Sequence, residues 1–167
     1  ARYGRPYSDM LGINLKLRRN EDAVRWFLAA ILYSKPIRES SATRTHQCFE
    51  THGVVTASRI VAAGWDRLVS ILDEGGYTRY DFSTADKLLE VFSNLEQLYG
   101  GDLNKLHDQS KDGAEVEANL KKLGKGIGDT TVSIFLRDMR HVWRKAAPKP
   151  TPLVTMAMNK LRIRDIE

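Results

Sequence analysis

The chain has 167 residues, 42% of them hydrophobic, which is enough for one cooperative domain or for two small lobes that share an interface. Its 26 Lys and Arg residues exceed its 21 Asp and Glu residues, and the net charge of +5 permits a polyanionic partner without requiring one. The single cysteine, Cys48, excludes an internal disulfide and any cluster held by four thiolates of this chain.

The longest apolar stretch runs from Trp26 to Tyr33, far short of the roughly 20 residues that a membrane-spanning helix needs. No apolar leader opens the sequence. We therefore expect a soluble, intracellular protein with no membrane partner.

The predicted elements are helical throughout. Apolar residues recur at helical spacing from Val24 to Leu32, after an acidic first turn, and Pro36 ends this helix. Glycine, proline or polar turns separate further helices expected over 39–52, 58–63, 66–73, 84–99, 102–107, 114–123, 130–142 and 152–161. No segment alternates as a strand would. The sequence predicts an all-α fold of about ten short helices, with residues 1–22 as an N-terminal arm joining a core over 23–167.

The most specific motif is Gly126-Ile127-Gly128, which separates two predicted helices within the hairpin segment 120–136. Glycines there let the backbone turn tightly and bring its N–H groups, with the N-terminus of the second helix, against a phosphate. Lys122 and Lys125 add positive charge beside it, as does Lys121. The alternative is an ordinary turn between helices with a solvated lysine face.

In this context the chain resembles the helix-hairpin-helix DNA glycosylases, in particular the relatives of endonuclease III. The resemblance covers roughly residues 23–162. Segment 27–35 is similar to the family's early core helix, 69–95 to the segment leading toward the hairpin, and 123–137 to the hairpin and its second helix. It implies a glycosylase-like fold in two lobes, double-stranded DNA, including damaged DNA, as the partner, and a role in base-excision repair or damaged-base recognition.

Two departures from the family concern its chemistry. Bifunctional members carry a lysine two residues after the last hairpin glycine, where this sequence has Thr130; a hydroxyl cannot form an imine, so lyase chemistry by that route is not expected. The family's aspartate corresponds to Thr151, which carries no charge. Asp138 is the alternative acid, against its interpretation as a surface residue between two arginines. The chain is thus at most a monofunctional N-glycosylase.

The resemblance also implies DNA contacts outside the hairpin, because a base-flipping protein must fill the gap left in the duplex. Lys35 matches a gap-filling residue, and the loop 76–80 matches a second wedge, in which Tyr77 would stack on bases and Arg79 would pair with phosphate. The alternative is a loop whose tyrosines cover a neighbouring helix. The predicted DNA-binding set is Lys122, Lys125, Gly126, Ile127, Gly128, Thr130, Lys35, Tyr77 and Arg79.

No cofactor is expected. The histidines share no spacing with cysteines or acids that would indicate a metal site, and the family's iron–sulfur cluster needs four cysteines.

Three functions remain open: a glycosylase that works without the usual lysine and uses an acid such as Asp138, an inactive module that binds distorted DNA, and a module that binds a protein. Loss of both chemical residues argues against the first, and the hairpin lysines argue against the third. We favour a glycosylase-like DNA-binding protein.

Overall fold

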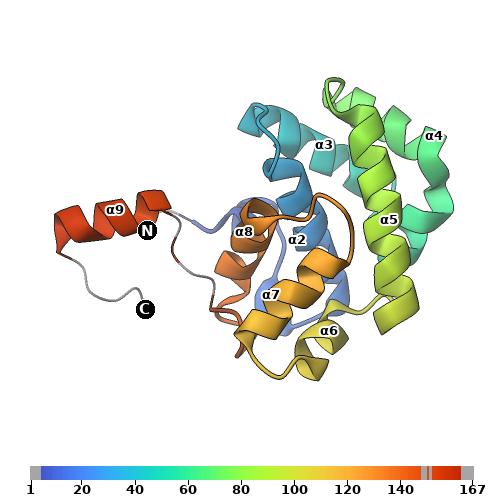
Figure 1. The fold of residues 1–167 in the computed structure, drawn as a ribbon. Coiled ribbons are helices and arrows are strands. Elements are labelled where there is room, and N and C mark those ends of the chain that lie inside the picture. The colour runs from blue at the N-terminus through green and yellow to red at the C-terminus, as the bar shows by residue number, and fades with distance from the viewer. Residues whose placement is uncertain (1–4, 148–149, 151, 163–167) are drawn as a thin grey trace.

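The computed structural model describes residues 5–147, 150 and 152–162. Within these residues it contains α-helices, one 3₁₀ helix and no strand, which confirms the predicted all-α class (Figure 1). The helices are α1 (Tyr7–Met10), η1 (Leu15–Leu17), α2 (Asn20–Tyr33), α3 (Glu39–Thr51), α4 (Ala57–Gly75), α5 (Asp81–Tyr99), α6 (Leu103–Gln109), α7 (Gly113–Lys122), α8 (Asp129–Met139) and α9 (Pro152–Leu161). The finer expectation, a glycosylase-like arrangement in two lobes, stays a prediction.

Helix α2 is the centre of the core. Every residue from Trp26 to Leu32 is at most 1% exposed, as expected for a helix that is apolar on all sides. The Phe27 ring packs edge-on against Phe135 of α8 and Phe92 of α5, with centroids 5.0 and 6.2 Å away. The Trp26 indole donates to the Phe135 carbonyl at 3.0 Å. Helix α2 therefore positions the middle of α8, the helix that the hairpin precedes.

Helix α4 joins two of the predicted helices. Gly64 lies inside it with φ 73° and ψ 172°, so the two predicted runs meet at a kink. The first begins at Ala57, one residue before the predicted start, and is capped by Thr56, whose hydroxyl accepts from the Arg59 N–H at 3.3 Å. Helix α5 begins at Asp81, three residues before the predicted start, so the turn between α4 and α5 is short.

The N-terminal segment closes over the far end of α8. The Ser8 N–H and hydroxyl both donate to one oxygen of Asp138, at 3.1 and 2.9 Å. Ile13 is 1% exposed and belongs to the core. The Tyr7 ring packs 5.4 Å from that of Tyr33, at the end of α2.

Helix α9 stands apart from the helical body in Figure 1, and none of its residues is buried. Its side chains include the exposed Leu153 and Met156. Across the described part of the chain, no helix combines the length and apolarity needed to span a membrane.

Candidate nucleic-acid interface

Helix α5 holds the backbone of the hairpin between α7 and α8. Three α5 side chains, spaced three and four residues apart and hence on one helix face, each bind a hairpin peptide group. The pairs are Lys87 Nζ to the Gly126 carbonyl at 3.1 Å, the Lys125 N–H to Glu90 Oε1 at 3.1 Å, and Asn94 Nδ2 to the Leu123 carbonyl at 2.8 Å. Ile127 inserts into the core with 4% exposure. These contacts hold the hairpin backbone in one conformation.

The hairpin glycines serve different purposes. A Cβ on Gly124 would lie 2.6 Å from Val91 Cγ2, so this glycine permits close packing on α5. Gly126 has φ +86°, a left-handed conformation that favours glycine. Gly128 has φ −105°, which any residue adopts, and among the described residues other than its chain neighbours no heavy atom lies within 4 Å of where its Cβ would be. The fold itself therefore has no use for a glycine at position 128, and its bare surface is open to a partner.

The N-terminus of α8 presents its first N–H groups at that bare surface. Gly128 is the N-cap residue, and no side chain caps the helix. The positive end of the helix dipole and these N–H groups favour an anion. Asp129 lies in the first turn, but Lys121 pairs with it at 2.5 Å and lowers its pKa. Much of that acid's charge is thereby offset, leaving the exposed Lys122 and Lys125 as the local positive charge.

Two further predicted DNA contacts lie together on other loops. Lys35, which follows α2, places its ammonium 5.2 Å from the centre of the Tyr80 ring. The Arg79 guanidinium lies 5.5 Å from the same ring. Lys87, which binds the hairpin, lies near this cluster. Burial lowers the pKa of Lys87, and the positive charge of Lys35 lowers it further. Segments that precede α3, α5 and α8 thus converge on one region.

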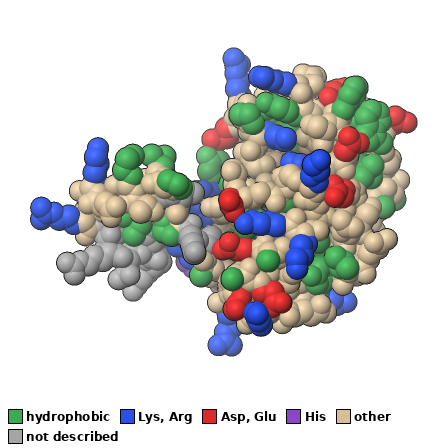
Figure 2. All heavy atoms as spheres, viewed as in Figure 1, with side chains coloured by type: hydrophobic (Ala, Val, Ile, Leu, Met, Phe, Trp, Pro, Cys, Tyr) green, Lys and Arg blue, Asp and Glu red, His purple; other side chains and the backbone are tan. Residues whose placement is uncertain are grey.

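The charge of this region is mixed. On the face drawn in Figure 2, Lys and Arg side chains alternate with Asp and Glu and do not form one continuous basic surface. This pattern agrees with the modest net charge, and it makes backbone N–H groups an important part of any anion site here.

Tyr77 does not fit its predicted role in stacking on bases. It is 1% exposed, and its hydroxyl donates to the Leu32 carbonyl at 2.6 Å. Its burial follows from the end of α4: Gly76 is left-handed, with φ 87°, and the Tyr77 N–H returns to the Leu72 carbonyl at 2.9 Å. A helix that ends in this way commonly packs the next side chain against its last turn. The Gly75-Gly76 pair was the sequence signal for it. Tyr80, half-buried, is the tyrosine that reaches the cation cluster.

Asp138 is held in a structural role. Its side chain is 5% exposed and is bound by Ser8, so it is not the surface acid that the alternative interpretation expected. It lies eight residues beyond Thr130 on α8, which is about 12 Å along a helix axis. Its place at the far end of α8 separates it from the hairpin. Thr130 itself is exposed at the hairpin. Thr151 lies outside the described residues.

A small cavity of about 220 Å³ lies between the end of α2 and α8. Sequence reasoning missed it, because its walls come from segments far apart in the chain. Its lining consists of Tyr7, Tyr33, Ile37, Glu39, Ala42, Ile134 and Arg137.

The cavity is aromatic with a polar rim. The Tyr7 hydroxyl donates to Glu39 at 2.8 Å, and the Arg137 guanidinium lies 5.7 Å from the Tyr7 ring. Two wall residues, Tyr33 and Ile37, bracket Lys35 in sequence. A third, Ile134, lies one helical turn beyond Thr130, on the same side of α8. Residues that line the cavity are thus close in sequence to two of the predicted DNA contacts, Lys35 and Thr130.

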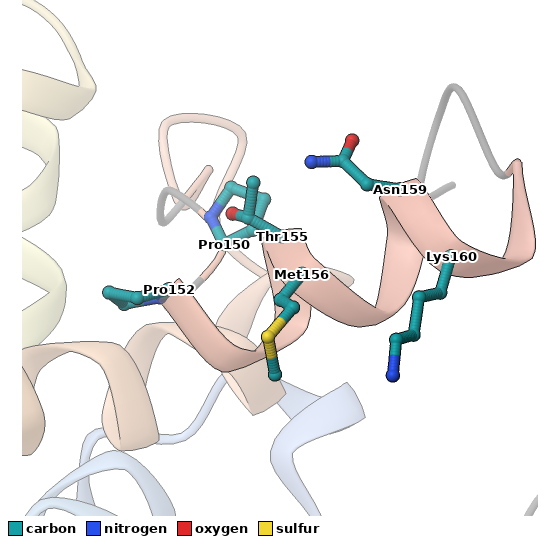
Figure 3. Close-up of a pocket in the computed structure, with 6 residues that line it drawn as sticks. All are labelled: Pro150, Pro152, Thr155, Met156, Asn159 and Lys160. Atoms are coloured by element: carbon teal, nitrogen blue, oxygen red, sulfur yellow. The ribbon is translucent and has the colours of Figure 1, made fainter.

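A larger hollow, of about 670 Å³, is lined, as far as the described residues go, by Pro150 and by residues of α9. Figure 3 shows that its side chains do not converge: Thr155 and Asn159 lie on one side of the helix, and Met156 and Lys160 on the other. Specific ligand sites depend on polar groups that point to one place, so this hollow is a weaker candidate.

We also looked for a metal centre in the structure and for similar proteins. The described residues contain no group of three or more His, Cys, Asp or Glu side chains placed to hold a metal ion. No protein-family model, curated protein or solved structure matches the chain.

Proposed function

We propose that this protein binds double-stranded DNA as a helix-hairpin-helix protein of the DNA glycosylase type, and that it recognises damaged or distorted base pairs. The observation that carries the proposal is Gly128, a glycine with no internal role at the uncapped start of α8. A phosphate of the DNA strand would lie on the N–H groups there, with Lys122 and Lys125 beside it. Such contacts fix the position of a strand and carry no sequence information.

The neighbouring elements suit a nucleotide turned out of the duplex. Lys35, whose ammonium lies over the Tyr80 ring, would occupy the gap, and the cavity beside it would receive the base. The tilted Tyr7 and Tyr33 rings offer an apolar wall, while Glu39 and Arg137 offer hydrogen-bonding groups at its edge. Base selectivity would depend on the shape of this cavity.

A second candidate, binding of distorted DNA without catalysis, is favoured by a specific observation. Asp138 is occupied by Ser8 at the far end of α8, and Thr130 offers no amine at the hairpin. For a monofunctional glycosylase, Glu39 would be the carboxylate that lines the cavity. Glu39→Gln therefore tests the catalytic candidate, because it should abolish base release and leave binding intact. An inactive module releases no base in either the wild type or the variant.

The proposal is tested with a panel of duplexes, each carrying one lesion or mismatch, scored for both binding and base release. We expect tighter binding to at least one distorted duplex than to the undamaged duplex, and weaker binding by Gly128→Val. A folded wild-type protein that binds none of the duplexes would overturn the proposal. Base release without strand cleavage would select the glycosylase, and binding alone the inactive module.

A further inference from the structure

A buried lysine beneath the hairpin has no negatively charged partner among the residues that the structure describes. Lys87 is only 8% exposed, and its ammonium donates to the Gly126 carbonyl at 3.1 Å. Among the described residues, no carboxylate lies within ion-pairing distance of it. Lysines are almost never this buried unless they are paired, because removing an ammonium from water is costly.

The acids close to Lys87 in sequence are engaged elsewhere. Glu90 accepts the Lys125 N–H, and Asp86 accepts the Trp65 indole N–H at 2.9 Å. The nearby charge that acts on Lys87 is a second cation, Lys35, which lowers its pKa together with burial, the larger cause. Within the described part of the chain, the Gly126 carbonyl is therefore the only group that partly neutralises this ammonium.

The ammonium lies directly against the hairpin. A Cβ on Gly126 would lie 3.0 Å from Lys87 Cε and 3.1 Å from its Nζ, so the lysine side chain lies in close contact with this glycine. Gly126 and Gly128 are both exposed at the hairpin, although Lys87 beside them is buried. An anion at the hairpin would thus be separated from Lys87 by one layer of backbone, where the low dielectric strengthens their attraction.

We propose that Lys87 is the built-in counter-charge for a DNA phosphate bound at the hairpin, so that the ammonium and the α8 N-terminus form one anion site. This inference rests on the proposed function. In the free protein the buried ammonium lowers the stability of the fold. When a phosphodiester binds at the hairpin, its negative charge attracts the ammonium, and this attraction strengthens binding. Lys87 is accordingly a binding residue that acts through the hairpin backbone, in addition to the exposed lysines.

Removing the charge should weaken DNA binding while sparing the fold. For Lys87→Met we expect a duplex affinity lowered roughly ten- to hundredfold, the effect of losing one poorly screened positive charge a few ångströms from the phosphate. The slope of log affinity against log salt should become shallower by up to about 0.9, the contribution of one neutralised phosphate. The melting temperature should stay level or rise, since a buried charge has been replaced by an apolar side chain.

The experiment compares Lys87→Met, Lys87→Gln and Lys87→Arg with the control Lys111→Met, an exposed lysine in the turn before α7. A labelled duplex is titrated over a salt series, and each variant is melted without DNA. We expect Met and Gln to weaken binding, and Arg and the control to keep it. Lys87→Gln retains a donor for the Gly126 carbonyl, so full binding by Gln would mean that Lys87 only supports the hairpin.

The inference and the proposed function fail separately. If the wild type binds DNA, Gly128→Val weakens binding and the folded Lys87→Gln variant binds with the wild-type salt slope, the inference alone is overturned. If Lys87→Met does not fold, the duplex affinities and salt slopes of Lys87→Gln and Lys87→Arg are compared instead. Equal values for the two variants overturn the inference. A wild type that binds no duplex overturns the proposed function, and the inference with it.

Discussion

Two glycine-to-valine changes in one hairpin should have opposite effects. For Gly128→Val we expect little damage to the free protein: φ is −105°, nothing lies within 4 Å of the new Cβ, and the loss is that of a glycine at an N-cap, about 1 kcal/mol or less. For Gly124→Val we expect a stability loss of about 1–3 kcal/mol or more, because the Cβ would lie 2.6 Å from Val91 Cγ2 in the packed contact with α5.

DNA affinity should show the reverse order. The valine at position 128 would cover the N–H groups at the start of α8, and the loss of one hydrogen bond to a charged phosphate corresponds to about 1.5–3 kcal/mol, or about 10- to 150-fold in affinity. Folded Gly124→Val should bind with nearly wild-type affinity, because its side chain faces α5. The free energy of unfolding is measured with urea, and affinity by fluorescence anisotropy of a labelled duplex. Gly128→Val with full affinity would refute this reasoning and leave the hairpin as a structural corner.

Three other outcomes are expected. Borohydride trapping on abasic-site DNA should give no covalent adduct, because Thr130 stands where an amine is needed; a trapped species that disappears in Lys125→Ala would contradict this. Asp138→Ala should lower the free energy of unfolding by about 1–3 kcal/mol, since Ser8 loses its acceptor, and leave DNA binding unchanged; weaker binding with full stability would count against the structural role. Burial lowers the pKa of His46 below 6.5, so the unfolded chain binds the proton more readily, and stability should decline as pH falls below about 6.5. In His46→Gln the unfolding midpoint measured against pH should decline less, and an identical decline would contradict the assignment.

Helix positions followed well from the sequence where periodicity and end signals agreed. The helix predicted over 39–52 is α3, Glu39–Thr51, and the last predicted helix, 152–161, matches α9. Asn20 is the first residue of α2, and its side-chain amide holds the start of α6. The amide donates to the Gly101 carbonyl at 2.8 Å and accepts the Leu103 N–H at 3.0 Å. A local pattern does not reveal that such a side chain has a distant partner.

The candidate site was predictable only in its local part. Two glycines around a buried isoleucine indicated the hairpin, and the exposed Lys122, Lys125 and Thr130 lie where that motif placed them. The three contacts by which α5 side chains hold the hairpin were not predicted. A lysine such as Lys87 within a helical pattern is usually interpreted as exposed to solvent. Its burial depends on a tertiary contact with Gly126 that no spacing in the sequence encodes.

The central claim is that the hairpin binds the phosphate backbone, and it is tested most directly by the salt dependence of duplex affinity. The measurement compares the wild type with the Lys122→Glu, Lys125→Glu double variant, once circular dichroism has shown that the variant is folded. We predict a steep linear fall of log affinity with log salt for the wild type, and a much weaker affinity with a shallower slope for the variant. Equal affinity and equal slope in the two proteins would contradict the account.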